Sequence, residues 1–344
     1  MKNKKSKKDG FGNFKEAMKK ISKGKWDFFK LTLDYFFCRW RFHVNLNEYV
    51  KYELYNLKNR YRKDFLLVYH QKNRYINITT RHFTRSKFIS YKRLPDLFVR
   101  EIILLPHCGE DEFVEFMKKH QKAVLKPDRG SLGIGIEIFE YVDDESVRAK
   151  FKTFSEKKPV VCEEFIRQHH ALDELNPFSV NTVRVVTILN EGEVEVVAAI
   201  LKTGGTSYKF VDNMHNGGVG GQLDIETGIV TTFGRNYLNR EYVFHPVTNA
   251  QIIGFRVPNW DKVIALAKEA HQRQPQCLIF GWDIAITEDG AEIVEVNNAP
   301  GPLLMQTMDR VPKGRKIIKM MKKTKIPQQY SKKDVYKPDY EKYL

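Results

Sequence analysis

The sequence predicts an α+β protein built mainly on antiparallel strands, with a helical region near its N-terminus. The first observation is a pair of apolar, β-branched segments, 280–287 and 291–297, on either side of an Asp-Gly turn, which is a strong signal for a β-hairpin. The second is a strand, a glycine-rich loop and a further strand over 123–141. The third is the region 26–72, whose aromatic and aliphatic residues recur at helical spacing and predict two or three helices.

The predicted hairpin carries three polar residues on one face. With the turn centred near Asp289, Asp283 lies directly opposite Glu295, and Asn297 shares their side of the pleat. Two opposed carboxylates repel each other unless a cation lies between them. Oxygen ligands of this kind suit Mg²⁺, which takes one or two protein carboxylates and completes its shell with water and nucleotide phosphates. We therefore predict a metal site at these three residues; the alternative is a solvated face with incidental acids.

The loop of the second segment is rich in glycine. Lys126 ends its first strand, and Gly130, Gly133 and Gly135 allow a flexible loop whose amides can close over phosphate oxygens. No Gly-Lys-Ser or Gly-Lys-Thr follows, so the loop is not a Walker A motif. A strand instead of a helix comes next, so it is not a Rossmann fingerprint. Taken alone, a plain glycine-rich hairpin fits these residues equally well.

Helix signals occupy the segments around these strands. A short helix is expected over 111–120, and acidic residues in the first turn open another over 143–154. Asn259 is expected to cap a helix over 261–273, one face of which is apolar. Beyond Pro302 a helical tail is expected.

Length and composition limit the class of protein. A chain of 344 residues with 42% hydrophobic content is long enough to bury a sizeable core. Its four cysteines show neither metal-ligand spacing nor a paired framework, which predicts a reducing compartment. No apolar run reaches the length of a membrane span, and the basic N-terminus is not followed by the apolar segment of a signal peptide. We therefore expect a cytoplasmic protein.

The net charge of +16 is concentrated at the two ends of the chain. Residues 1–30 hold 11 Lys or Arg against 3 Asp or Glu, and residues 309–344 hold 12 against 4. Next to aromatics such as Trp26, Phe28 and Phe29, these cations favour an anionic membrane surface by roughly 1 kcal/mol each. Nucleic acid is not the expected partner, because no RNA- or DNA-binding motif is present. A pair of solubilising tails is the alternative.

Several short motifs, taken in order, make the chain resemble the ATP-grasp superfamily, and most closely its sugar-transfer-associated branch, which is related to α-L-glutamate ligases. The segments that carry the resemblance are 124–135, 161–166, 179–187, 198–202, 216–221 and 283–301. Each motif is short, and the specificity lies in finding all of them in this order over roughly residues 35–308.

The resemblance implies two α+β subdomains that grip ATP between them, with Mg²⁺ on the C-terminal hairpin. It divides the chain into a basic tail with a helical region (1–105), a nucleotide-binding subdomain (106–170), a C-terminal subdomain with the metal hairpin (171–308) and a basic tail (309–344). The usual reaction of the family makes an acylphosphate from a carboxylate, which an amine or a thiol then attacks.

The resemblance also assigns catalytic and nucleotide-binding residues. Lys126 would meet the α- and β-phosphates, and Lys202 the β- and γ-phosphates. Arg184 and Asn181 would hold the γ-phosphate or the acylphosphate; the alternative for Arg184 is an ion pair with a sheet acid. The remaining nucleotide contacts are expected at Arg129, Gly130, Ser131, Gly133, Gly135, Glu163, Glu164, Phe165 and Ile166.

Two parts of the expected site are less defined. His215, in the glycine-rich loop 212–221, is a candidate general base, although a loop histidine without a catalytic task fits equally well. The acid expected for the ribose is replaced by the segment 167–171, in which Gln168 and His169 offer hydrogen bonds instead.

The predicted function is that of an ATP- and Mg²⁺-dependent carboxylate–amine or carboxylate–thiol ligase. The family branch implies cell-surface polysaccharide or glycoconjugate assembly, with a small-molecule or lipid-linked saccharide substrate, at the inner face of the cell membrane. One alternative is an ATP-grasp kinase that phosphorylates a sugar or lipid hydroxyl. A second is a non-catalytic membrane or nucleic-acid adaptor, which has no need of Asp283, Glu295 and Lys126 together.

Overall fold

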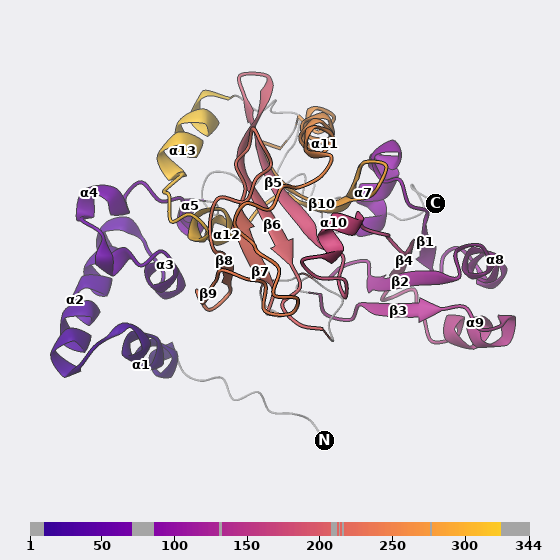
Figure 1. Cartoon of the computed structure of the whole chain (residues 1–344), viewed down its shortest axis with the longest axis horizontal. Coiled ribbons are helices and arrows are strands. Elements are labelled where there is room, and N and C mark those ends of the chain that lie inside the picture. The colour runs from indigo at the N-terminus through magenta and orange to yellow at the C-terminus, as the bar shows by residue number, and fades with distance from the viewer. Residues whose placement is uncertain are drawn as a thin grey trace. The chain divides into compact units, whose positions relative to one another are not determined.

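The structure is a computed structural model of the whole chain (Figure 1). It describes residues 10–70, 86–130, 133–207, 212, 214, 217–275 and 277–324. The chain divides into two compact units, one of residues 1–74 with 301–319 and the other of residues 75–300 with 320–344.

The first unit is helical. Its helices are α1 (Gly10–Ile21), α2 (Lys25–Phe42), α3 (Leu46–Lys51), the 3₁₀ helix η1 (Leu54–Asn56), α4 (Asn59–Arg62), α5 (Val68–His70) and α12 (Pro302–Thr307), and α13 (Gly314–Lys323) begins in it. A capping box formed by Asn45 and Glu48 starts α3. Tyr35, Tyr49 and Tyr52 are buried in its core. The helices expected within 26–72 are therefore present.

The buried side chain of Gln306 joins the C-terminal segment of this unit to its N-terminal helices. Its amide oxygen accepts hydrogen bonds from the backbone N–H groups of Leu66 and Lys313, each at 2.9 Å. Its amide nitrogen lies 2.9 Å from the Tyr52 hydroxyl and 2.9 Å from the Leu66 carbonyl, and 3.1 Å from the carbonyl of Pro302. The hydrogen-bonding capacity of this one amide is fully used, so it ties residues that are far apart in the sequence.

The second unit contains a small antiparallel sheet. Its strands are β1 (Ile102–Leu105), β2 (Lys122–Pro127), β3 (Glu137–Glu140) and β4 (Val160–Glu164), in the order β1-β4-β2-β3. Helices α8 (Glu110–His120) and α9 (Asp144–Phe151) pack on it (Figure 1). Phe113 and Met117 of α8, Val147 of α9 and Leu125 of β2 are buried together between the helices and the sheet.

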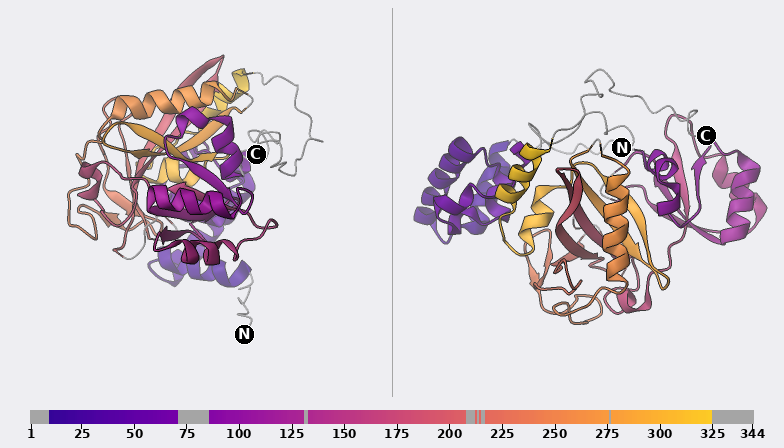
Figure 2. Two further views of the ribbon diagram at one scale, coloured as in Figure 1. Left: turned by 90° about the vertical axis from the view of Figure 1, so that its right-hand side faces the viewer. Right: turned by 90° about the horizontal axis from the view of Figure 1, so that it is seen from above.

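A larger antiparallel sheet of seven strands forms the rest of this unit. Its strands are β5 (Thr182–Asn190), β6 (Glu193–Thr203), β7 (Val219–Gln222), β8 (Gly234–Asn236), β9 (Glu241–Tyr242), β10 (Ile279–Ile286) and β11 (Ala291–Asn297), in the order β11-β10-β5-β6-β7-β8-β9. Helix α11 (Trp260–Gln272) packs along one face of it (Figure 2). The short helices α7 (Lys87–Arg93), η4 (Pro95–Leu97) and α10 (His170–Asp173) complete the unit.

A bulge in the β10–β11 hairpin determines which side chains share the face away from α11. Asp283 pairs with Glu295, but the next pair is Ile284 with Ile293, so Val294 is the extra residue. Ile284 and Ile293 both belong to the core that α11 covers. Glu292, which pairs with Ala285, therefore lies on the same face as Asp283.

The structure confirms most of the elements expected from the sequence and corrects one detail. The helices expected over 111–120, 143–154 and 261–273 are α8, α9 and α11. Asn259, however, does not cap α11 with its side chain: its backbone is left-handed, and its amide donates to the Thr287 carbonyl at 3.0 Å. Among the described residues, no helix has the length and apolar character needed to cross a membrane.

Replacing Gln306 with alanine is expected to destabilise the first unit by about 2–4 kcal/mol, because the backbone N–H groups of Leu66 and Lys313 lose their acceptor and two carbonyls lose a donor. Equilibrium unfolding in urea measures this change. The matched control is Gln251→Ala, at an exposed glutamine whose amide donates to the Ile253 carbonyl, and it should stay within about 0.5 kcal/mol of wild type. Equal losses in the two variants would contradict the role given to Gln306.

Candidate active site

Three charged residues form a row across neighbouring strands of the large sheet. Arg184 of β5 is the cross-strand partner of Asp283 on β10, and Asp283 is in turn the partner of Glu295 on β11. Residues that are directly opposite one another in a sheet point to the same face. The predicted pairing of Asp283 with Glu295 is therefore present, and Arg184 lies on the other side of the same acid.

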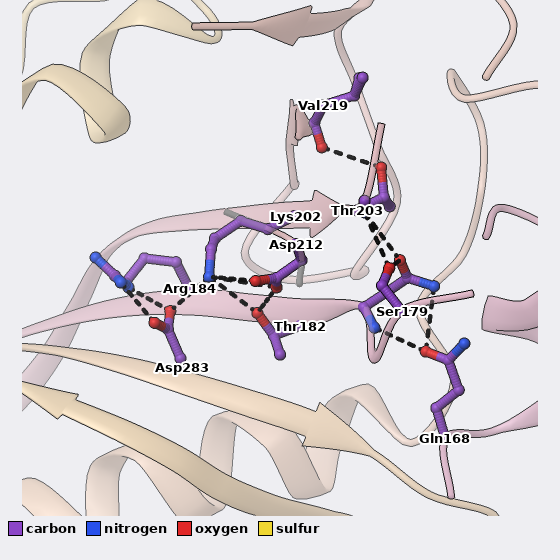
Figure 3. Close-up of polar contacts among 11 residues, drawn as sticks. Gln168, Ser179, Thr182, Arg184, Lys202, Thr203, Asp212, Val219 and Asp283 are labelled. Carbon is purple, nitrogen blue, oxygen red and sulfur yellow. Dashed lines mark hydrogen bonds and ion pairs between the residues drawn. The ribbon is translucent and has the colours of Figure 1, made fainter. Parts of the chain in front are cut away.

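Asp283 is held by two cations (Figure 3). The Nε and Nη2 atoms of Arg184 donate to its two carboxylate oxygens at 2.5 and 2.6 Å. The ammonium of Lys202, at the end of β6, lies 3.2 Å from Asp283 Oδ1. The sequence leaves two roles open for Arg184, binding of a phosphate anion and an ion pair with an acid of the sheet. The contact present in the structure is the ion pair.

The charges of this cluster are fixed by their neighbours. Burial alone would raise the pKa of Asp283, but the charges of Arg184 and Lys202 outweigh burial and lower the pKa to about 2. Burial would likewise lower the pKa of each cation, and the carboxylates beside them raise it instead. The acid and both cations therefore carry full charge across the physiological range.

The cluster continues from Lys202 to Asp212 and Thr182 (Figure 3). The Lys202 ammonium lies 3.1 Å from the Thr182 hydroxyl and 3.3 Å from Asp212 Oδ2, and the hydroxyl donates to Asp212. Asp212 is described in the structure, although three residues of the glycine-rich loop that follows it, 213, 215 and 216, and with them the candidate base His215, lie outside the described residues. The sequence had given Asp212 no role.

A glycine leaves space for the Arg184 side chain. Gly281 lies two residues before Asp283 on the same face of β10. A Cβ atom at this position would be 3.1 Å from Arg184 Cδ and 2.8 Å from Pro300 Cβ. A larger residue at position 281 must therefore displace Pro300 or crowd the Arg184 side chain, so glycine leaves both of them where they are.

The small sheet carries a second group of buried charges. Lys126 of β2 forms an ion pair with Glu163 of β4 at 2.7 Å, and Glu163 also accepts a hydrogen bond from Arg100 Nε at 2.9 Å. Burial lowers the pKa of Lys126 despite its partner, whereas the two cations hold the pKa of Glu163 below its usual value against the opposing effect of burial. Lys126 and Glu163, both predicted to contact the nucleotide, are thus in direct contact.

Arg100 connects the small sheet to the edge of the large one. Its Nη1 atom donates to Glu292 at 2.9 Å and to the Ile293 carbonyl at 2.7 Å, and both belong to the edge strand β11. Simple alternation from Glu295 places Glu292 on the opposite face, which is why sequence reasoning missed it; the bulge at Val294 reverses that assignment. Arg100 is next to Glu101, just before a strand, and belongs to no recognisable motif.

The glycine-rich loop is anchored at its start. The carboxylate of Asp128 accepts hydrogen bonds from the Ser86 hydroxyl and the Phe88 backbone N–H, each at 2.9 Å. Gly133 and Gly135 have φ angles of 70° and 76°, a conformation that favours glycine. Among the other predicted contacts, Arg129 and Gly130 are exposed, and Ser131 lies outside the described residues.

The predicted adenine-binding segment follows β4. Glu164 accepts a hydrogen bond from the Glu101 backbone N–H at 3.2 Å. The Phe165 ring lies 4.5 Å from the ammonium of Lys122, and Ile166 is largely buried. Glu164 is the last residue of β4, the strand that carries Glu163, and Phe165 and Ile166 follow it directly. In the sheet, β4 lies between β1 and β2.

Asn181 belongs to a separate group of hydrogen bonds, of which Figure 3 labels Gln168 and Ser179. Its amide nitrogen lies within 3.1 Å of Gln168 Oε1 and of the carbonyls of Leu172 and Asn176. Its amide oxygen accepts from the Gly204 backbone N–H at 3.3 Å. The protein itself thus engages both ends of Asn181, and Gln168, a candidate for the ribose, is part of the same group.

The hairpin residues fit Mg²⁺ in their chemistry. Asp283, Glu295 and Asn297 offer two carboxylates and an amide, the hard oxygen donors that this ion takes. The Asn297 amide nitrogen is buried without a hydrogen-bond partner, and turning the amide over presents its oxygen instead. The repulsion between the acids does not by itself require a metal ion, because Arg184 and Lys202 already offset it. The prediction that the two opposed acids need a metal ion between them is therefore wrong, while the three side chains remain a suitable donor set for Mg²⁺.

Two sheets that each carry buried lysines, and a hairpin with oxygen donors, define an ATP-dependent enzyme of the ATP-grasp class. A family model described as sugar-transfer associated ATP-grasp matches residues 106–324. Because this match covers more than half of the sequence, the chain belongs to that family, and the predicted ATP-grasp fold is confirmed. A search of curated proteins found no match.

Several solved structures are similar to this chain at low identity. D-alanine–D-alanine ligase from Bacillus anthracis is 16% identical, covers 78% of this chain and 77% of its own length, and has a TM-score of 0.45. The ATP-grasp ligase PsnB, complexed with a minimal precursor, is 14% identical over 72% of this chain and 63% of its own length, with a TM-score of 0.44. The D-cycloserine synthetase DcsG is 10% identical over 70% and 71%, with a TM-score of 0.43.

The lowered pKa of Asp283 predicts a specific loss of stability in acid. An acid whose pKa is lower in the folded state stabilises the fold above its ordinary pKa of 3.8, and this stabilisation is lost as the pH falls towards 2. The full contribution is about 2 kcal/mol, of which about 1 kcal/mol is lost by pH 3. The difference in unfolding free energy between wild type and Asp283→Asn, measured in urea from pH 6 to pH 3, should shrink by that amount. A constant difference would show that Asp283 is not ionised against its two cations.

Proposed function

We propose that the protein is an ATP- and Mg²⁺-dependent ligase that activates a carboxylate as an acylphosphate and joins it to an amine or a thiol. The observation that carries this proposal is the set of acid-held cations on both sheets: the buried Lys126 on the small sheet, and the buried Lys202 with the largely buried Arg184 on the large one. Fixed cations in a dry site stabilise the negative charge that develops during phosphoryl transfer more strongly than cations in water do.

The balance of charge supports a requirement for Mg²⁺. The two groups contain four cations, Arg100, Lys126, Arg184 and Lys202, and five carboxylates, Glu163, Glu292, Asp212, Asp283 and Glu295. A triphosphate brings several further negative charges, so these residues alone do not offset it. A nucleotide that arrives with a divalent cation meets oxygen donors on the hairpin and ammonium groups on the strands, which makes the binding of the two cooperative.

The charged residues of the candidate site each have a role in this proposal. Lys126 binds the phosphates nearest the nucleoside, while Arg184 and Lys202 hold the phosphoryl group that is transferred and the acylphosphate formed from it. Asp283 keeps both of these cations in place and, since about four acceptor positions surround an ionised carboxylate, still has one to offer a metal ion. Mg²⁺ held by Asp283, Glu295 and Asn297 supplies charge neutralisation at the phosphates.

The class of substrate that we propose rests on the description of the family. The description of the family as sugar-transfer associated supports a saccharide or glycoconjugate substrate in the assembly of cell-surface polysaccharide. A carboxylate-bearing saccharide, or a lipid-linked one, is the class of donor that we expect.

An isotope experiment separates a ligase from a kinase. With a candidate carboxylate labelled with ¹⁸O, acylphosphate formation transfers one labelled oxygen to the phosphate that is released, because the carboxylate oxygen becomes the bridging atom. Mass spectrometry of the inorganic phosphate measures this transfer. A stable phosphorylated product from a hydroxyl substrate, with unlabelled phosphate, would replace the ligase by an ATP-grasp kinase.

Nucleotide binding tests the site residues directly. Lys126→Ala and Glu295→Gln should each weaken the binding of a nonhydrolysable ATP analogue with Mg²⁺ at least tenfold, as measured by isothermal titration calorimetry, because each removes one charged contact. Lys118→Ala on α8 and Glu269→Gln on α11 are matched controls at surface positions and should bind as wild type does. Chelation of Mg²⁺ should weaken binding to the wild type but have little further effect on Glu295→Gln. Unchanged affinity in both site variants would remove the nucleotide site from this place.

A further inference from the structure

Helix α2 has two apolar faces; one is buried in the core, and the other is largely exposed, with a single ring contact to the rest of the unit in the described residues, between Phe36 and Phe14 at 5.7 Å. Tyr35 and Cys38 are buried in the core of the helical unit, and Phe28, Leu31 and Phe42 pack against that core. At 100° per residue these five positions share one side of the helix. This face explains why α2 forms and how it is attached.

The opposite face is also apolar but lies in solvent. We call it the aromatic stripe, and its members share large side chains that are between 39% and 75% exposed: Trp26, Phe29, Leu33, Phe36, Phe37 and Trp40. Their spacing of three, four, three, one and three residues confines them to an arc of about 100° along the whole length of the helix. Scattered exposed apolar residues are ordinary, whereas a continuous apolar stripe on the surface marks a site of interaction.

Cations flank the aromatic stripe on both sides. Lys25 and Arg39 lie along one border and Lys30 and Arg41 along the other, and all four are exposed. The two acids of the helix do not offset them at the surface. Asp34 is turned inwards, where it accepts hydrogen bonds from Arg62 at 2.6 Å and from the Tyr49 hydroxyl at 2.7 Å, and Asp27 accepts one from a backbone N–H at the start of the helix. The exposed side of α2 is therefore aromatic at its centre and positive at its borders.

This arrangement matches the surface of an anionic lipid bilayer. Tryptophan and phenylalanine insert at the boundary between headgroups and acyl chains, and long basic side chains extend outwards to lipid phosphates while their stems remain apolar. A second copy of the chain fits less well, because two such stripes packed together bring the four cations of each copy against those of the other. We propose that α2 lies in the plane of an anionic membrane and attaches the protein to it through the aromatic stripe. This attachment goes beyond the ATP-dependent reaction and does not depend on it.

Vesicle binding by the full-length protein tests this proposal. Flotation with vesicles of phosphatidylglycerol and phosphatidylcholine should recover the protein, and binding should fall at least tenfold with phosphatidylcholine alone or at high salt. Of the four tryptophans, Trp26 and Trp40 are on the stripe, whereas Trp260 and Trp282 are buried in the other unit. A blue shift of tryptophan emission on vesicle addition, and its quenching by brominated lipid, should therefore report insertion of the stripe.

Variants assign the binding to α2. Leu33→Glu with Trp40→Glu should lower binding to anionic vesicles at least tenfold, and Lys30→Glu with Arg41→Glu about as much. The matched control is Leu238→Glu, because Leu238 is 76% exposed and lies outside the helical unit; this variant should bind as wild type does. Trp26→Phe with Trp40→Phe should keep the binding and lose the emission change.

Two outcomes would overturn the proposal. One is vesicle binding that is equal in wild type and in both charged variants, all with thermal unfolding midpoints close to that of wild type. The other is self-association of the wild type in sedimentation experiments that Trp40→Glu abolishes while vesicle binding is absent, which would make the stripe an interface between copies of this chain.

Discussion

The largely buried pair of Arg184 and Asp283 is the interaction on which the rest of the candidate active site depends. Removing two full charges from water is costly, and their attraction offsets that cost only when the contact is close and bidentate. Strand register provides this geometry, because the two residues are cross-strand partners on β5 and β10. With Asp283 ionised in this position, Lys202 has a counter-ion deep in the sheet and keeps its own charge. The cations are therefore in place before any phosphate arrives, which is the condition under which electrostatic stabilisation is most effective.

Ion pairs of Arg100 also connect the small sheet to the large one. Glu163 is the common partner of Lys126 and Arg100, and Arg100 in turn covers carbonyls and Glu292 at the edge of the large sheet. An exposed sheet edge presents unpaired backbone groups, and here the guanidinium of Arg100 donates hydrogen bonds to two carbonyls of the edge strand, those of Ile293 and Val294. The same residue that protects the edge strand thus supports the lysine expected to bind phosphate.

The parts of the site that could be predicted are those encoded locally. A turn centred at Asp289 predicts Asp283 and Glu295 as partners, and they are partners, but the bulge makes them so: the register next to the turn, Ile286 with Ala291, would by itself place Val294 opposite Asp283. Glu292 could not be predicted, because alternation assumes an unbroken pleat and the bulge at Val294 interrupts it. Arg100 is beyond local reasoning for another cause: its two acidic partners lie 63 and 192 residues further along the chain. From the sequence alone, a metal ion is the expected counter-charge of Asp283 and Glu295. Residue spacing does not indicate that Arg184 and Lys202, from other strands, lie beside Asp283.

The position of Arg100 between two acids has a consequence for how this sequence can evolve. Loss of Glu163 removes the acid paired with Lys126 and leaves Arg100 with Glu292 alone, and loss of Arg100 removes the cation paired with Glu292 and leaves Glu163 with Lys126 alone. Stranding a buried charge is far more damaging than removing the whole group. Changes at these positions are therefore tolerated only in combination, and across homologous chains Arg100, Glu163 and Glu292 should covary.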